Sequence, residues 1–162
     1  MNCRNCGATM KLVDGRDYFV CEYCTAFYFP NADPASVDGV QVLGERSELA
    51  CPVCEQTLVA GTIDKRRVLH CERCRGVLAT NAEFVEIVKS RRSKYSGPDL
   101  RPTPLDQKQL KRSLRCPACR SAMDTHPYYG PGAIVVDTCP RCFLIWLDHG
   151  EIAVIEQSPG RR

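Results

Sequence analysis

The 162-residue sequence predicts a small α+β protein dominated by metal sites. Three β-hairpins follow one another, and the second and third are each followed by a short helix. Three observations support this prediction. Twelve cysteines form six Cys-x-x-Cys pairs, turn signals lie between the two pairs of each set, and helix-capping motifs follow the second and third sets. The length suits about one ordinary domain.

Cysteine spacing is the strongest of these signals. Taken in order, the six pairs make three sets of four, with 14, 16 and 19 residues between the pairs of a set. This spacing is typical of four-cysteine zinc sites, so we expect three tandem zinc ribbons and three Zn²⁺ ions. An iron–sulfur centre would use the same ligands. The predicted ligands are Cys3, Cys6, Cys21, Cys24, Cys51, Cys54, Cys71, Cys74, Cys116, Cys119, Cys139 and Cys142.

A disulfide framework in a secreted protein is the alternative to metal sites. The first six residues are polar and contain no apolar signal-peptide region. The longest wholly apolar run, 143–147, is far shorter than the roughly 20 residues of a membrane span. We therefore expect a cytoplasmic protein whose cysteines stay reduced and bind zinc.

The first unit, residues 1–30, is predicted to be a zinc ribbon without a helix. Asp14-Gly15 is a hairpin turn signal, and Pro30 stands where a helix would begin in the other units. The aromatic residues of this unit most simply form its small core, although nucleic-acid bases could also stack on them. Residues 31–50 are predicted to be a linker, in which 40–43 could form a short edge strand.

The second unit, residues 51–95, is predicted to be a zinc ribbon followed by a helix. Its hairpin arms are 57–60 and 68–71, with Lys65-Arg66-Arg67 at or near the turn. His70 precedes a ligand in the sequence. Because Cys71 already completes its set, we expect His70 to support the site indirectly or to be exposed.

Two capping boxes predict where helices begin. Thr80 is followed three residues later by Glu83, and Asp148 by Glu151, which is the pattern of an N-cap and its reciprocal partner. The apolar residues that follow recur at helical spacing: Phe84, Ile87, Val88, Ile152 and Ile155.

The remaining segments complete the predicted organisation. Residues 96–115 are expected to be a basic linker with a short helix that begins at Asp106. Residues 116–157 are the third zinc ribbon with its helix, and residues 158–162 are a tail.

Charge is concentrated locally rather than over the whole chain. The formal net charge is +3; three zinc ions add 6 and twelve thiolates subtract 12, which leaves −3 for the loaded protein. The stretch 89–115 holds nine basic and two acidic residues, which suits contact with phosphates or an ordinary exposed helix face. The candidate nucleic-acid-binding residues are Lys65, Arg66, Arg67, Lys89, Arg91, Arg92, Lys94, Lys108, Lys111 and Arg112.

The third unit contains a distinctive set of residues: Cys116, Pro117, Cys119, Cys139, Pro140, Cys142, Trp146, Leu147, Asp148, Gly150 and Glu151. In this set the unit resembles the TFIIB-type zinc-ribbon family of transcription factor zinc fingers. Two glycines of the family pattern are replaced by Phe143 and Leu144, so the second knuckle is expected to turn differently. The second unit matches more weakly, through its cysteines, Gly76 and Glu83. The resemblance implies a zinc ribbon with a C-terminal helix that contacts nucleic acid or protein, and it implies no reaction.

Three functions fit these observations. A closed shell of four thiolates leaves no open metal position for substrate, so we expect no enzyme. The leading hypothesis is a nucleic-acid-binding module, for DNA or RNA, with a possible role in transcription. The second is a protein–protein adaptor that uses Phe143, Trp146 or the helix stripes as contacts. The third is a redox or zinc-responsive protein. The sequence leaves open whether the ribbons pack together.

Overall fold

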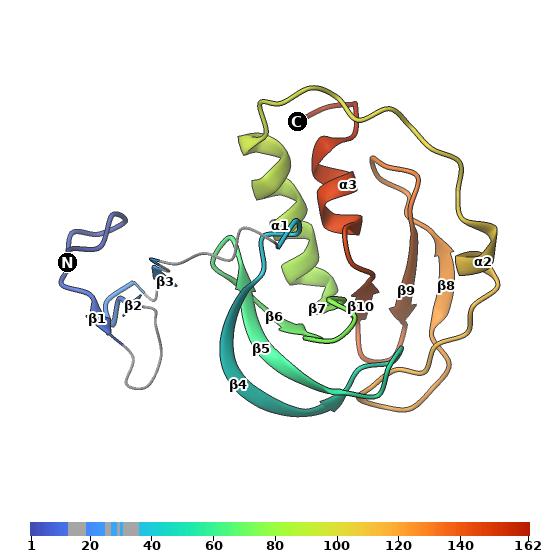
Figure 1. The fold of residues 1–162 in the computed structure, drawn as a ribbon, viewed down its shortest axis with the longest axis horizontal. Helices are drawn as coiled ribbons and strands as arrows, with labels where there is room; N and C mark the ends of the chain where they lie inside the picture. Colours follow the sequence, from blue (N-terminus) through green and yellow to red (C-terminus); the bar gives the residue numbers. More distant parts are fainter. Residues whose placement is uncertain (13–18, 25–26, 29, 31–35) are drawn as a thin grey trace.

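The computed structural model describes residues 1–12, 19–24, 27–28, 30 and 36–162, and Figure 1 shows its two sheets. The first unit contributes a three-stranded sheet of β1 (Lys11–Leu12), β2 (Phe19–Val20) and β3 (Phe27–Tyr28), in that order. It has its own small core of Cys3, Met10 and Cys21. The predicted turn at Asp14-Gly15 lies outside the described residues.

The rest of the chain forms a seven-stranded antiparallel sheet in the order β4-β5-β6-β7-β10-β9-β8. Helices α1 and α3 lie side by side against it, and a long connection arches from α1 to α2 (Figure 1). The elements are β4 (Gln41–Ala50), β5 (Thr57–Ile63), β6 (Arg66–His70), β7 (Val77–Thr80), α1 (Asn81–Lys94), α2 (Gln107–Leu110), β8 (Asp124–Pro127), β9 (Val135–Cys139), β10 (Leu144–Leu147) and α3 (Glu151–Gln157).

Strand β4 corrects the prediction of a linker over residues 31–50. It extends ten residues along β5, from Gln41 opposite Thr62 to Ala50 opposite Thr57, with register shifts on either side of Arg46. Burial of Leu43, which is 1% exposed, ties the strand to the core. The sequence signal was weak because charged residues interrupt the apolar pattern on the solvent side of this edge strand.

The second and third ribbons join through their equivalent strands, β7 and β10. These strands pair antiparallel, and Trp146 lies opposite Leu78, its counterpart in the sequence repeat. The pair of Val77 with Leu147 is matched by the pair of Ala79 with Ile145, so a local two-fold relation connects the two ribbons. The packing of α1 against α3 follows the same relation. The two ribbons therefore form one body, a point that the sequence left open.

The joined sheet has a different core on each face, because successive strand residues point to opposite sides. On the helix side, Val77, Ala79, Ile145 and Leu147 pack with the apolar stripes of α1 and α3. On the other side, Leu78 and Trp146 pack with cysteines of both ribbons. Gly76 is required for this second core, since a Cβ there would lie 2.1 Å from the Trp146 ring.

Helices α1 and α3 are capped in different ways. Thr80 caps α1 as predicted, with its hydroxyl accepting a hydrogen bond from the Glu83 N–H at 3.1 Å. The prediction for Asp148 is confirmed in one half only: its N–H donates to the Glu151 carboxylate at 2.8 Å, as in a capping box, but α3 begins at Glu151 after Gly150 and the Asp148 side chain does not cap it. Instead, the carboxylate of Asp38, 2% exposed, accepts from the N–H groups of Gly150 at 2.7 Å and Ala153 at 3.0 Å.

Asp38 should therefore stabilise α3 from a distance in the chain. We expect Asp38→Ala to lower the free energy of unfolding by about 1–2 kcal/mol, because two helical N–H groups lose their acceptor. Chemical denaturation of the zinc-loaded protein measures the loss. Thr80→Ala, which removes the local cap of α1, serves as the reference, at about 1 kcal/mol. An Asp38→Ala variant as stable as the parent protein would contradict this role.

Candidate metal centres and charged surfaces

The three predicted sets of cysteines converge into three separate clusters. Within each set of four, the Sγ atoms all lie within 4.8 Å of one another. The clusters are Cys3, Cys6, Cys21 and Cys24; Cys51, Cys54, Cys71 and Cys74; and Cys116, Cys119, Cys139 and Cys142. Four soft sulfur ligands at this separation fit a tetrahedral zinc ion, so each cluster is able to bind one.

The backbone around each cluster forms the same tight knuckle. In five described knuckles, the residue after the second cysteine has a positive φ: Gly7, Glu55, Arg75, Arg120 and Phe143, between 57° and 79°. Its N–H donates to the carbonyl of the first cysteine of the pair at 2.8–2.9 Å. This turn points backbone N–H groups toward the sulfur atoms. The Val53 N–H, for example, donates to Cys51 Sγ at 3.4 Å.

Phe143 corrects one expectation from the sequence. Its φ is +57°, and its N–H reaches the Cys139 carbonyl at 2.9 Å, so the last knuckle turns as the others do even without glycine. Phe143 as a whole is 65% exposed.

The thiols in these clusters differ in acidity. Burial raises the pKa of Cys51 to about 11, whereas hydrogen bonds from the side chain and backbone of Ser121 lower the pKa of Cys119 to about 6. Zinc binds thiolates, so loading a cluster must displace protons from its less acidic members. A loaded four-thiolate site holds the two knuckles of a ribbon together and supplies folding free energy that the small cores lack.

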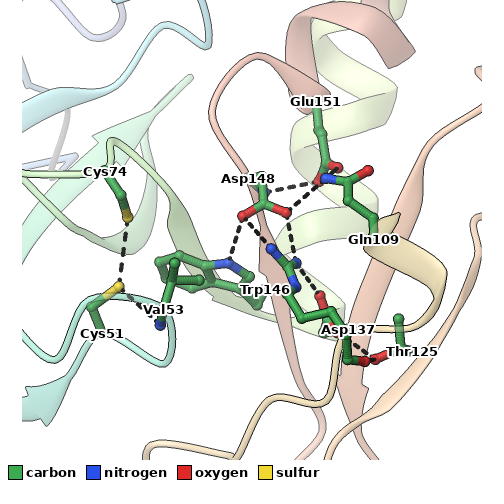
Figure 2. A network of polar contacts seen from close by, with 10 residues as sticks. Cys51, Val53, Cys74, Gln109, Thr125, Asp137, Trp146, Asp148 and Glu151 are labelled. Carbon is green, nitrogen blue, oxygen red and sulfur yellow. Dashed lines mark hydrogen bonds and ion pairs between the residues drawn. The ribbon is translucent and has the colours of Figure 1, made fainter. Parts of the chain in front are cut away.

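Trp146 lies between the second and third metal clusters. It is fully buried and packs in one core with Cys51 and Cys71 of the second ribbon and Cys116 and Cys139 of the third. Its indole Nε1 donates to the Asp148 carboxylate at 3.2 Å (Figure 2). Trp146 is therefore unavailable as the partner contact that the adaptor hypothesis assigned to it.

Asp148 is the centre of a polar network instead of a helix cap (Figure 2). Its Oδ2 accepts from Gln109 at 3.0 Å and from Arg112 Nη2 at 2.6 Å. Arg112 also reaches the buried Asp137 at 2.7 Å, and Gln109 also reaches Glu151 at 3.2 Å. The contacts of Gln109 in α2 and of Arg112, two residues past its end, thus fasten the connecting segment to the third ribbon.

This network raises the pKa of Glu151 to about 8. Burial is the main cause, and the negative charge of Asp148 adds to it. For Arg112, burial disfavours the charge, but hydrogen bonds to Asp148 and Asp137 raise its pKa overall. The cluster therefore favours a protonated Glu151 at neutral pH, next to a fully charged Arg112.

Half of the ten predicted nucleic-acid-binding residues are engaged within the protein. Arg92 is 4% exposed and donates to the carbonyls of Ile155 and Ser158. The other internal pairs are Arg91 with Glu156, Arg112 with Asp137 and Asp148, Lys94 with Asp64, and Arg66 with Glu83 and Glu86. The last two pairs are partly exposed. Arg91, Arg92 and Arg112 are therefore structural residues, which corrects their assignment to a binding surface.

The five other candidates are exposed, and none has a carboxylate partner in the part of the chain that the structure describes. They are Lys65, Arg67, Lys89, Lys108 and Lys111. They do not form one tract, because Figure 1 places α2 on the opposite side of the body from the β5–β6 hairpin tip. Of the histidines, His70 is buried and its Nδ1 lacks a partner among the described residues; burial lowers its pKa.

Other surfaces of the sequence hypotheses are also covered. The apolar stripes of the helices, including Phe84, Ile87, Ile152 and Ile155, are buried in the core between the helices and the sheet. No helix within the described residues is long and apolar enough to cross a membrane.

Comparison with protein families agrees with this geometry. Residues 115–157 match the model of the family described as transcription factor zinc-finger, which confirms the resemblance seen in the third unit. Searches of curated proteins and of solved structures found no match.

Loss of one zinc ligand should affect both joined ribbons. We expect Cys139→Ser to unfold the third ribbon and to destabilise the second, because Trp146 packs against both clusters. Backbone NMR spectra and zinc content by native mass spectrometry measure the extent. Cys21→Ser is the matched control and should disturb the first ribbon alone. Intact signals from 51–95 in the Cys139→Ser protein would show that the two ribbons fold independently.

Glu151 should make stability depend on pH. Since its folded-state pKa of about 8 lies above the ordinary value of 4.5, its contribution to stability is complete below pH 4.5 and is lost as the pH rises through 8. Between pH 6 and 8, Glu151→Gln should remove a slope of up to about 1.4 kcal/mol per pH unit. Denaturation at fixed zinc, with the exposed Glu45→Gln as control, tests this difference. Parallel stability curves for the parent and Glu151→Gln proteins would contradict it.

Proposed function

We propose that this protein is a nucleic-acid-binding module built on structural zinc ribbons. The observation that carries the proposal is the tip of the β5–β6 hairpin, which presents Lys65 and Arg67 to solvent. Asp64 and Lys65 form a two-residue turn with φ of +47° and +69°. A turn of this kind holds the hairpin tip in a defined geometry.

Helix α1 supports the hairpin tip from one side. The Ser90 hydroxyl donates to Asp64 at 2.7 Å, and Lys94 pairs with the same carboxylate at 3.3 Å. Lys89, also on α1, is exposed. Cations held on a rigid scaffold suit contact with phosphates, which give affinity without reading sequence.

The metal sites have a structural role in this proposal. Four thiolates close the coordination shell of a zinc ion, and we assign no reaction to it. Of the contacts that the adaptor hypothesis uses, Trp146 and the helix stripes are buried, and only Phe143 is exposed. The loaded protein has a net charge of about −3 by the count above, so the proposal depends on local charge.

Salt dependence of binding tests the proposal. We expect zinc-loaded protein to bind mixed-sequence duplex DNA with a slope of log K on log salt near −3.6, for about four phosphate contacts. Replacing Lys65 and Arg67 by Glu should weaken binding to all sequences alike and bring the slope to about −1.8.

The matched control carries the same change of charge in and directly after α2, as Lys108→Glu with Lys111→Glu. It should bind nearly as the parent protein does. Equal losses in both double variants would show that net charge, and not the hairpin tip, governs binding. Affinity weaker than about 10⁻⁴ M for duplex and single strands alike would refute the proposed function.

A further inference from the structure

Phe143 is an exposed aromatic residue in a strained backbone conformation. Its φ of +57° lies in the left-handed region, where glycine is the least costly residue, and the residue is 65% exposed. The residues after the second cysteine of the other described knuckles, Gly7, Glu55, Arg75 and Arg120, have the same left-handed conformation, with φ between 60° and 79°. The backbone conformation therefore belongs to the knuckle itself, whereas a side chain so exposed buries little apolar surface and adds little to the stability of the fold.

Three arginines surround the same pair of knuckles. Arg115 Nη1 donates to the Arg120 carbonyl at 3.2 Å, and Arg141 Nη1 donates to the Ser121 hydroxyl at 3.1 Å. All three guanidinium groups belong to exposed residues. Both acceptors are neutral, so these contacts position the guanidinium groups of Arg115 and Arg141 without cancelling their positive charge.

The two knuckles of the third ribbon contain no carboxylate. They read Cys-Pro-Ala-Cys-Arg over 116–120 and Cys-Pro-Arg-Cys-Phe over 139–143. The knuckles of the second ribbon, by contrast, include Glu55 and Glu72. The third ribbon thus differs in the charge that its metal-binding end presents to solvent.

The metal cluster brings these residues close together. Cys119 Sγ lies 3.6 Å from Cys139 Sγ, and all four sulfurs lie within 4.8 Å of one another. Arg120 and Phe143 each directly follow a ligand of this cluster, so they flank the same site. We define Arg115, Arg120, Arg141 and Phe143 as the knuckle surface.

We propose that the knuckle surface binds single-stranded nucleic acid, with a base stacked on Phe143 and phosphates at the arginines. This inference rests on the proposed function and adds a second contact site with its own preference. An aromatic face stacks on any unpaired base, whereas duplex DNA keeps its base faces stacked on one another. Arginine suits both phosphate contact and stacking.

Paired variants of Phe143 test the proposal. Zinc-loaded protein is titrated with a labelled single strand of about 20 nucleotides and with the duplex of the same sequence. Phe143→Ala should weaken single-strand binding by at least about fivefold, the low end of the contribution of a stacked base, and leave duplex binding nearly unchanged. Phe143→Tyr should retain binding. Tyr129→Ala, which removes a remote aromatic side chain that is 87% exposed, is the control.

Phe143→Gly separates binding from folding. Because glycine adopts positive φ without strain, this variant should raise the melting temperature while lowering single-strand affinity as Phe143→Ala does. A lower melting temperature in Phe143→Gly would show that Phe143 serves the fold and would overturn the proposal. Native mass spectrometry should find three zinc ions in every variant.

The arginines have a separate readout. Arg141→Gln should reduce the slope of log K on log salt for the single strand by about 0.7, whereas Arg101→Gln in the linker should not. If Arg141→Gln lowers zinc affinity but leaves the slope unchanged, the arginines only balance the thiolate charge, and the proposal fails. Duplex binding that depends on Lys65 and Arg67, without any effect of Phe143 variants, would refute this inference alone. Absence of binding to either probe would refute the proposed function as well.

Discussion

The pairing of β7 with β10 is the interaction on which the body of the protein depends. Each ribbon alone leaves one strand edge unpaired and one apolar face too small for a stable core. Their pairing satisfies both edges and brings Trp146 between two metal clusters. Gly76 allows that contact, because any side chain there would occupy the space of the indole. Zinc at the second and third clusters therefore stabilises the shared core around Trp146 as well as the two hairpins.

The sequence could predict what depends on neighbours in the chain. Cysteine spacing gave all twelve ligands, and the capping box gave Thr80, because both signals act over a few residues. The cap of α3 could not be found in this way, since Asp38 reaches Gly150 across 112 positions. The sequence around Asp148 predicts a local helix cap, but its carboxylate instead pairs with Arg112, which is distant in the sequence. Strand β4 likewise forms because it pairs with β5, and the local sequence alone does not predict its full length.

Charge patterning misled for a related physical reason. The run of basic residues predicts one exposed surface. Composition does not reveal, however, that a long basic side chain is buried against fixed acceptors. Arg92 is nearly inaccessible because it serves carbonyls at the end of α3, and Arg112 compensates buried carboxylates. Removing one of these arginines would be costly, because its partners would be left unpaired inside the protein. The cations that remain lie in separate places, so any contact with phosphates must be local.

The two-fold relation between the ribbons gives an internal comparison for these local sites. Arg75 and Phe143 occupy equivalent positions, with φ of +60° and +57°, and both N–H groups bond to the first cysteine of their pair. The backbone requirement is therefore the same, and it does not explain why one position holds an arginine and the other an exposed aromatic ring. Gly76 and Leu144, one residue later, differ for a reason that the fold supplies, namely the approach of Trp146 to Gly76. Because packing does not require the difference, the exposed side chain of Phe143 can be replaced without disturbing the shared core, and this makes it the position at which stacking on a nucleic-acid base can be tested apart from folding.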